Sequence, residues 1–133
     1  MRLTSRSEYA LLALVHLARQ KGEDYVPVRT IAEAQDIPPL FLEQILLTLK
    51  RSHHVRSLKG QHGGYRLAKP PDEITLAEIV RLFDGPLAPS ESASKHFHGS
   101  TPIEREKKVL RLLKQIRDYV SDTLEGTTLA DVC

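Results

Sequence analysis

Residues 56–69 read RSLKGQHGGYRLAK, with Gly60, Gly63 and Gly64 inside five positions, cations on both sides and no carboxylate. A glycine-rich basic stretch suits either a loop that cradles the phosphates of a nucleotide or the turn of a hairpin. A phosphate loop of the P-loop type reads G-x-x-x-x-G-K-[ST] between a strand and a helix. Here Gly64 leads into YRL, which alternates apolar and charged residues as a half-buried strand does. The stretch therefore predicts a β-hairpin with strands within 54–59 and 65–68.

The segment before this hairpin predicts two helices joined by a tight break. RTIAEAQD (29–36) is a brief helix with Ile31 and Ala34 on its inner side, and DIPP ends it. A longer helix is expected at about 39–52, because its apolar residues recur at i, i+3, i+4 and i+7: Leu42, Ile45, Leu46 and Leu49. Helix, turn and longer helix make a helix-turn-helix, whose second helix can enter a DNA major groove. Followed by a hairpin, it becomes a winged helix-turn-helix, and the fold class is mainly α with a small β-hairpin.

Helix boundaries elsewhere are read from capping residues. Ser5 with Glu8 is a capping box for a helix over about 5–21, and Thr75 with Glu78 starts another over 75–84. The final TTLADV predicts a helical turn capped by Thr127 or Thr128. Residues 85–102 are rich in Pro, Ser and Gly and predict a flexible linker. The domains expected are a winged helix-turn-helix at 1–84 (wing about 54–68), this linker, and a helical segment at 103–133.

The helix expected from about 103 to 125 is about 35 Å long, which exceeds what so small a domain can cover. Its apolar residues step by about 3.5 positions: Val109, Leu112, Leu113, Ile116, Tyr119, Val120 and Leu124. Packing on its own domain would bury part of this stripe. We expect the same helix of a second subunit to bury the rest, which predicts a homodimer.

Charge is distributed unevenly along the chain. Residues 1–69 hold 11 Lys/Arg against 6 Asp/Glu, and residues 70–133 hold 8 against 11. The excess peaks between Lys50 and Lys69, which favours a surface that binds a polyanion. No apolar run approaches a membrane span, the N-terminal residues do not resemble a signal peptide, and Cys133 is the sole cysteine. These features predict a cytoplasmic protein.

Several stretches together resemble the Rrf-two family of bacterial transcription regulators, typified by iron–sulfur cluster regulators. They are MRLTSRSEYALLALVHLA (1–18), LEQIL (42–46), KGQHGGYRL (59–67), TLAEIVRLFDGP (75–86) and TTLADV (127–132). The resemblance implies a dimer of winged helix-turn-helix domains, joined by crossed long helices, on a near-palindromic operator. It also implies a glycine and a leucine where this chain has His53 and His54. These two residues are interpreted as tolerated substitutions at a half-exposed corner, and the alternative is that they make the seat of the wing less apolar or pH-sensitive.

Many members of that family hold an iron–sulfur cluster on three cysteines in the linker and long helix. This chain has no cysteine between Pro86 and Leu110, and thiolates are what hold such clusters. We expect no cofactor, and we expect His96 and His98 to be solvated and not metal ligands. The cysteine-free members, including one that resembles a regulator of cysteine metabolism working with a partner enzyme, are the most similar branch.

The function predicted is sequence-specific DNA binding by a homodimeric regulator, a repressor. At the start of the third helix, Leu40 would touch a thymine methyl, Glu43 a cytosine amino group and Gln44 an adenine, whereas Phe41 is expected in the core. The full set of residues expected at DNA is Arg2, Thr4, Ser5, Arg6, Tyr9, Pro39, Leu40, Glu43, Gln44, Lys50, Arg51, Arg56, Lys59, Gly60, His62, Gly63, Gly64 and Arg66.

Two other classes of function are alternatives for this sequence. The first is a protein-binding modulator of an enzyme or another regulator, with vestigial DNA contact, which the missing cluster cysteines and the atypical histidine corner motivate. The second is an enzyme, for which the sequence offers neither paired carboxylates nor a nucleophile motif. A redox role for Cys133 would require an accessible thiol that bridges two subunits. We expect no enzymatic activity.

Overall fold

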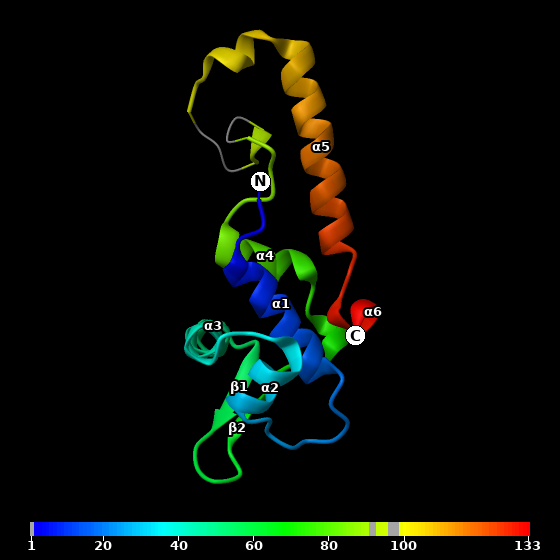
Figure 1. The fold of residues 1–133 in the computed structure, drawn as a ribbon. Coiled ribbons are helices and arrows are strands. Elements are labelled where there is room, and N and C mark those ends of the chain that lie inside the picture. Colours follow the sequence, from blue (N-terminus) through cyan, green and yellow to red (C-terminus); the bar gives the residue numbers. More distant parts are fainter. Residues whose placement is uncertain (1, 91–92, 96–98) are drawn as a thin grey trace.

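The computed structural model describes residues 2–90, 93–95 and 99–133, and Figure 1 shows their arrangement. As expected, the fold is mainly α with one antiparallel hairpin. In chain order the elements are α1 (Ser5–Ala18), α2 (Val28–Gln35), α3 (Pro39–Arg51), β1 (Val55–Leu58), β2 (Gly64–Leu67), the 3-10 turn η1 (Pro71–Glu73), α4 (Leu76–Asp84), the 3-10 turn η3 (Pro102–Arg105), α5 (Lys107–Glu125) and α6 (Leu129–Val132).

The core lies where α1, α2 and α3 meet. All four residues of the predicted α3 stripe are buried, together with Leu14 of α1 and Ile31 of α2. Ala34 is exposed, contrary to expectation, and Ala32 is the buried alanine of α2. The helix begins one residue earlier than predicted, at Val28, and the left-handed residue Asp36 ends it. The two helices of the motif thus share one apolar interface with α1.

The wing (residues 55–67, β1 with β2) pairs in the register Val55↔Leu67 to Leu58↔Gly64. An isolated bridge adds the connection between α1 and α2 to its edge, since Val26 and Tyr65 exchange two backbone hydrogen bonds of 2.8 Å. Val55 is buried, and Tyr65 and Leu67 pack on the same core. The wing is therefore fastened to the helical body along its second strand.

Gly64 is expected to tolerate no side chain. Its φ is +147°, and a Cβ added there would overlap the carbonyl of Val26. Gly64→Ala should lower the free energy of unfolding by about 3 kcal/mol, because both strain and a backbone clash arise at once. Gly60→Ala is the matched control, since Gly60 also has a positive φ but faces open space. Urea denaturation measures both, and equal losses for the two variants would refute the role of the clash.

Both ends of α1 differ from prediction, whereas the caps of α4 and α6 agree with it. The N-cap of α1 is Thr4, whose Oγ1 accepts from the backbone N–H of Ser7, and Ser5 is already helical. The helix ends at Ala18 and not near residue 21. Thr75 caps α4 as expected by accepting from the N–H of Glu78, and Thr128 caps α6 in a reciprocal capping box with Asp131.

Described residues of the segment after α4 pack against the rest of the chain. Leu87, Ala88 and Ala93 are buried, and Leu87 packs with Ala77 and Val80 of α4. The predicted helix start at Thr101 forms only the η3 turn, and α5 begins at Lys107. Residues 91–92 and 96–98 lie outside the described residues. The prediction that His96 and His98 are solvated falls on this part of the chain.

The long helix α5 leaves the winged domain and extends well beyond it (Figure 1). Its last turns are held to α4, because Val120 and Leu124 pack on the Ala77–Val80 cluster and Arg81 bonds Ser121 and Glu125. None of the helices in the described ranges is long and apolar enough to span a bilayer.

Candidate nucleic-acid interface

The outer face of α3 presents residues that could contact base edges. Because the buried stripe occupies one side of the helix, Pro39, Leu40, Glu43, Gln44 and Lys50 lie on the exposed side. Leu40 is 78% exposed, an unusual position for a leucine without a contact partner. The structure thus brings together the residues expected at bases, near the N-terminus of α3.

Phe41 does not lie in the core, contrary to expectation. It is 38% exposed, and its ring meets that of Tyr9 edge to face at 5.5 Å. Tyr9 lies on α1, so the aromatic pair braces the start of α3 against the first helix. Sequence periodicity could not separate Phe41 from the stripe, since it directly precedes Leu42.

The wing carries the second group of expected contacts. Arg56, Lys59, Gly60 and His62 are exposed, whereas Gly63 is buried where its N–H donates to the carbonyl of Gly60. A Cβ at Gly63 would overlap the carbonyl of Leu58. Gly63 and Gly64 therefore shape the wing, and their side-chain-free backbone is required by the fold itself.

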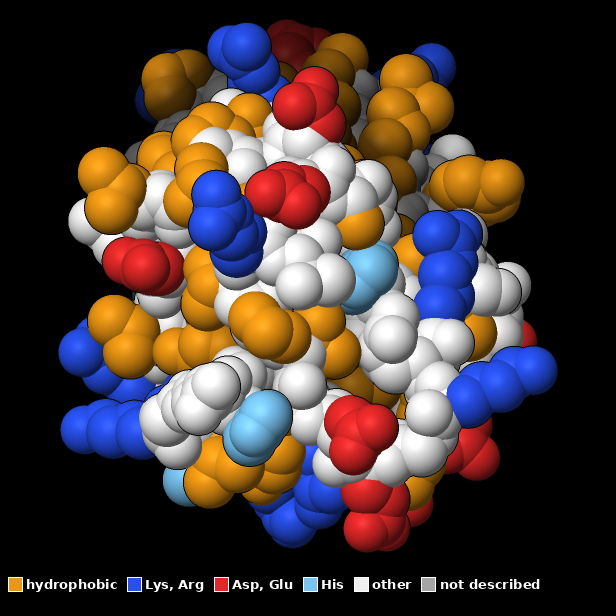
Figure 2. Space-filling model, turned by 60° about the horizontal axis from the view of Figure 1, so that its bottom comes forward, with side chains coloured by type: hydrophobic (Ala, Val, Ile, Leu, Met, Phe, Trp, Pro, Cys, Tyr) orange, Lys and Arg blue, Asp and Glu red, His pale blue; other side chains and the backbone are white. Residues whose placement is uncertain are grey.

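Figure 2 shows the end of the molecule that is lowest in Figure 1, turned to the front. Lys and Arg side chains lie mainly around the margin of this face, with apolar, uncharged and histidine side chains between them. Asp and Glu side chains are interspersed. The face is therefore a mixed surface with basic edges, a pattern that differs from the uniformly basic ribbon suggested by the run from Lys50 to Lys69.

Arg66 is turned into the molecule. Its guanidinium donates to the backbone carbonyl of Glu23 at 2.9 Å and lies over the ring of Tyr25 at 5.2 Å. These contacts engage the side chain within the chain and leave it 26% exposed, so Arg66 is less available for the expected phosphate contact than the exposed cations of the wing. The period-two pattern correctly placed Arg66 opposite Tyr65 and Leu67, but the sequence did not indicate that residues 23–25 lie over it.

The N-terminus of α1 is occupied by a carboxylate that sequence reasoning missed. Asp84, at the end of α4, accepts hydrogen bonds from Thr4 and from the hydroxyl of Ser7. Burial acts to raise the pKa of Asp84, but the hydrogen bonds from Ser7 and Thr4 hold it below its usual value. A carboxylate at this helix end already satisfies the helix dipole. Thr4 is thus engaged, which argues against its expected role at a phosphate.

The other expected residues of the N-terminal segment remain accessible. Arg2 and Ser5 are exposed, and Arg6 is exposed while its guanidinium lies 5.4 Å from the ring centre of Phe83. Arg51, at the end of α3, is also exposed. Of the cations expected at DNA, those exposed on the winged domain are therefore Arg2, Arg6, Lys50, Arg51, Arg56 and Lys59.

The corner between α3 and β1 contains a buried histidine. His53 adopts φ +63°, the left-handed conformation that glycine favours. His54 is 7% exposed, and its ring joins Ser52 Oγ (2.7 Å from Nδ1) to Glu78 Oε1 (3.2 Å from Nε2). The carboxylate of Glu78 thus serves the histidine of the wing seat and links it to α4.

Stability is expected to depend on pH through His54. Burial lowers the pKa of His54, with Glu78 acting in the opposite direction and Lys69 and His53 adding to the lowering. Below about pH 6.5 the unfolded chain takes up a proton that the folded state resists, so the free energy of unfolding should fall as pH decreases further. Urea denaturation at pH 7.5, 6.5 and 5.5 measures this, and His54→Leu should flatten the profile. An equally steep profile in that variant would show that other groups cause it.

Comparison with known proteins identifies the family of the chain. The family model Rrf2, described as an iron-dependent transcriptional regulator, matches residues 3–133. The chain belongs to the Rrf2 family. This is the Rrf-two family that the sequence resembles, and the chain is a helix-turn-helix transcriptional regulator.

Individual Rrf2 proteins resemble the chain over nearly its whole length. The HTH-type transcriptional regulator CymR of Bacillus subtilis is 33% identical over 132 residues, covering 99% of this chain and 89% of CymR. IscR of Aliivibrio salmonicida is 32% identical over 134 residues, covering 99% and 77%. The solved structure of CymR, the global cysteine regulator of B. subtilis, superposes with a TM-score of 0.78 at 30% identity, covering 99% and 95%. The winged-helix fold is shared.

The donor atoms of this chain do not fit the iron–sulfur group associated with the family. Cluster irons are held by several thiolates, and the whole sequence has one cysteine, Cys133. Its thiol is exposed, 3.8 Å from the carbonyl of Ala130. Within the described ranges, no group of three or more His, Cys, Asp or Glu is placed to hold a metal ion.

Proposed function

We propose that the protein is a homodimeric, sequence-specific regulator, a repressor, that binds a near-palindromic DNA operator in the cytoplasm without an iron–sulfur cluster. The observation that supports this most is the exposed start of α3, where Leu40, Glu43 and Gln44 project from a helix whose other face is fully buried. An exposed polar face on the second helix of a helix-turn-helix is the part that reads bases in the major groove.

Roles within the interface follow from chemistry and position. Glu43 can accept from a cytosine amino group, Gln44 can pair with adenine, and Leu40 can meet a thymine methyl. Lys50, Arg51, Arg56 and Lys59 would contact phosphates, which position the protein without reading sequence. Arg2, Arg6 and Ser5 at the start of α1 could add backbone contacts.

Dimerisation through α5 is supported by the apolar side chains that its own domain leaves uncovered. Val109, Leu112, Ile116 and Tyr119 are all exposed, with Tyr119 at 75%. They follow one another by three or four positions, so they share one side of the helix. Val120 and Leu124, also expected at the dimer contact, pack on the chain's own domain, and Leu113 is half-buried. The proposed dimer contact is therefore the part of α5 nearer its N-terminus.

A protein-binding modulator with weak DNA contact is the alternative. It is favoured by the loss of Thr4 and Arg66 from the set of free phosphate contacts, since both are engaged within the chain. A gel shift at low salt with the DNA upstream of the chain's own gene separates the two proposals. Retardation that survives competitor DNA supports the regulator, and its absence supports the modulator and a partner protein.

Substitutions at α3 are expected to change base preference, whereas substitutions at the wing are expected to weaken binding to every sequence. Gln44→Ala should relax base preference at one operator position and cost about 1–3 kcal/mol on the cognate site, because a bidentate contact is lost. Lys59→Ala should weaken binding to all sequences alike, because a phosphate contact is lost. Affinity selection from a randomised duplex library measures both. If the two variants changed the selected motif in the same way, the assignment of roles would be wrong.

A further inference from the structure

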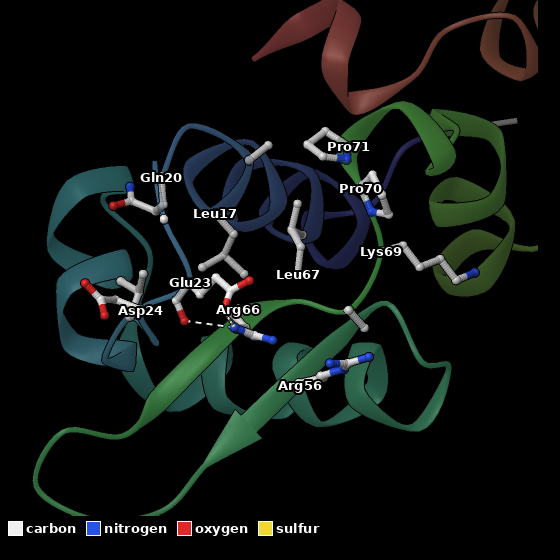
Figure 3. A pocket seen from close by; sticks show the side chains of 14 residues that line it. Leu17, Gln20, Glu23, Asp24, Arg56, Arg66, Leu67, Lys69, Pro70 and Pro71 are labelled. Carbon is white, nitrogen blue, oxygen red and sulfur yellow. Dashed lines mark hydrogen bonds and ion pairs between the residues drawn. The ribbon is translucent and has the colours of Figure 1, made fainter.

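A cavity of about 290 Å³ lies between the base of the wing and the connection from α1 to α2. Leu17, Val26, Leu67, Pro70 and Pro71 contribute apolar atoms to its lining. Figure 3 shows the charged residues around it: Arg56, Arg66 and Lys69 from the wing and its exit, and Glu23 and Asp24 from the connection. A concave site with apolar walls and a few charged groups has the character of a small-molecule pocket.

The cations of this cavity are incompletely neutralised. Arg56 and Arg66 are direct cross-strand partners, and like charges placed opposite one another destabilise a hairpin. Arg66 has an ion pair with Glu23 at 3.9 Å, but that carboxylate is almost fully exposed. In the part of the chain that the structure describes, neither Arg56 nor Lys69 has an ion pair.

Arg66 also carries an unsatisfied donor. Its Nε is buried and has no hydrogen-bond acceptor, although a buried donor without a partner is costly. The adjacent guanidinium nitrogen is used by the Glu23 carbonyl. The Nε atom itself is closed to a ligand, but the side chain of Arg66 is 26% exposed, so a carboxylate in the cavity can accept a hydrogen bond from the accessible terminal N–H groups of the guanidinium.

We propose that this cavity is a binding site for a small organic monocarboxylate. Three cations against two carboxylates leave one positive charge around the cavity, which a single carboxylate balances. The apolar walls suit a short hydrocarbon body and disfavour a bare inorganic anion. Because the connection also bridges to β2 through Val26 and Tyr65, a bound ligand would fasten the wing more firmly to the helical body.

Binding is tested on the full chain without DNA, so the result does not depend on the proposed regulator function. Butyrate, succinate and inorganic phosphate are titrated at constant ionic strength by calorimetry, and backbone amide shifts are followed by NMR. Butyrate is expected to bind at one saturable site with a Kd below about 1 mM, with shifts confined to residues 20–26 and 66–69. Succinate and phosphate should bind at least tenfold more weakly.

Matched variants locate the site. Arg66→Gln and Lys69→Gln should each weaken butyrate binding at least tenfold, and Lys69→Gln is informative even if loss of Arg66 disturbs the wing. Arg29→Gln is the control, because Arg29 is 88% exposed on α2 and pairs with Glu33 outside the cavity. No saturable butyrate binding, unchanged binding by Lys69→Gln, or binding of phosphate in preference to butyrate would each overturn the proposal.

Discussion

Operator affinity is expected to fall by ~10³–10⁵ between 50 and 200 mM salt, because neutralising roughly 6–10 phosphates releases their condensed counterions. Each winged domain exposes the cations Arg2, Arg6, Lys50, Arg51, Arg56 and Lys59. Two such domains can supply that many contacts even without Arg66. Fluorescence anisotropy of a labelled operator across a salt series measures the slope.

Two variants test whether the salt dependence of affinity arises from cations of the winged domain. Lys59→Ala should reduce the slope of log affinity against log salt by about one for each subunit. Lys108→Ala is the control, since Lys108 is an exposed cation on α5, outside the winged domain. A nearly flat salt response of the unmodified protein would contradict DNA binding through these residues.

Ile116→Glu is expected to convert the proposed dimer to a monomer. Ile116 is 42% exposed at the middle of the uncovered apolar side of α5, and a carboxylate buried in such a contact without a partner is strongly unfavourable. Affinity for a two-half-site operator should then fall by roughly 10²–10⁴, because the second winged domain no longer binds intramolecularly. Light scattering and anisotropy measure mass and affinity.

Two comparisons make the dimer experiment specific. Gln115→Glu introduces the same charge at an exposed neighbouring position and should leave mass and affinity unchanged. Affinity of Ile116→Glu for a single half-site should match that of the unmodified protein, which shows that the winged domain is intact. A dimeric Ile116→Glu protein would show that this side of α5 is not the contact between subunits.

Residues close together in the chain were sufficient to predict the helix-turn-helix and the wing. The stripe of α3, the proline break before it and the glycine turn of the wing each depend on residues close together in the chain, and all three are present as predicted. The predicted helix ends were less accurate where two neighbouring residues can both serve as the N-cap. Thr4 outcompetes Ser5 because Asp84, distant in sequence, binds Thr4 as well.

The candidate DNA contacts also fall into two groups: those whose exposure local patterns predicted, and those whose position depends on tertiary contacts. Leu40, Glu43, Gln44 and Lys59 are exposed as the helix and hairpin patterns predicted. Arg66 is engaged within the chain because residues 23–25 fold over the wing, and α5 divides its stripe between its own domain and the open side. Neither arrangement leaves a periodic signal in the sequence.

The sequence by itself determined the order of helices, the winged motif, the exposed face of α3 and the lack of cluster thiolates. Those properties follow from side-chain periodicity, turn chemistry and residue type, which act over a few positions. Only the tertiary structure decided that Asp84 closes the start of α1, that His54 reaches Glu78, and that Arg56, Arg66 and Lys69 surround one cavity. The first two contacts join residues far apart in the chain, and the cavity brings the connection at Glu23 and Asp24 next to the wing, so all three arrangements depend on packing of the whole domain.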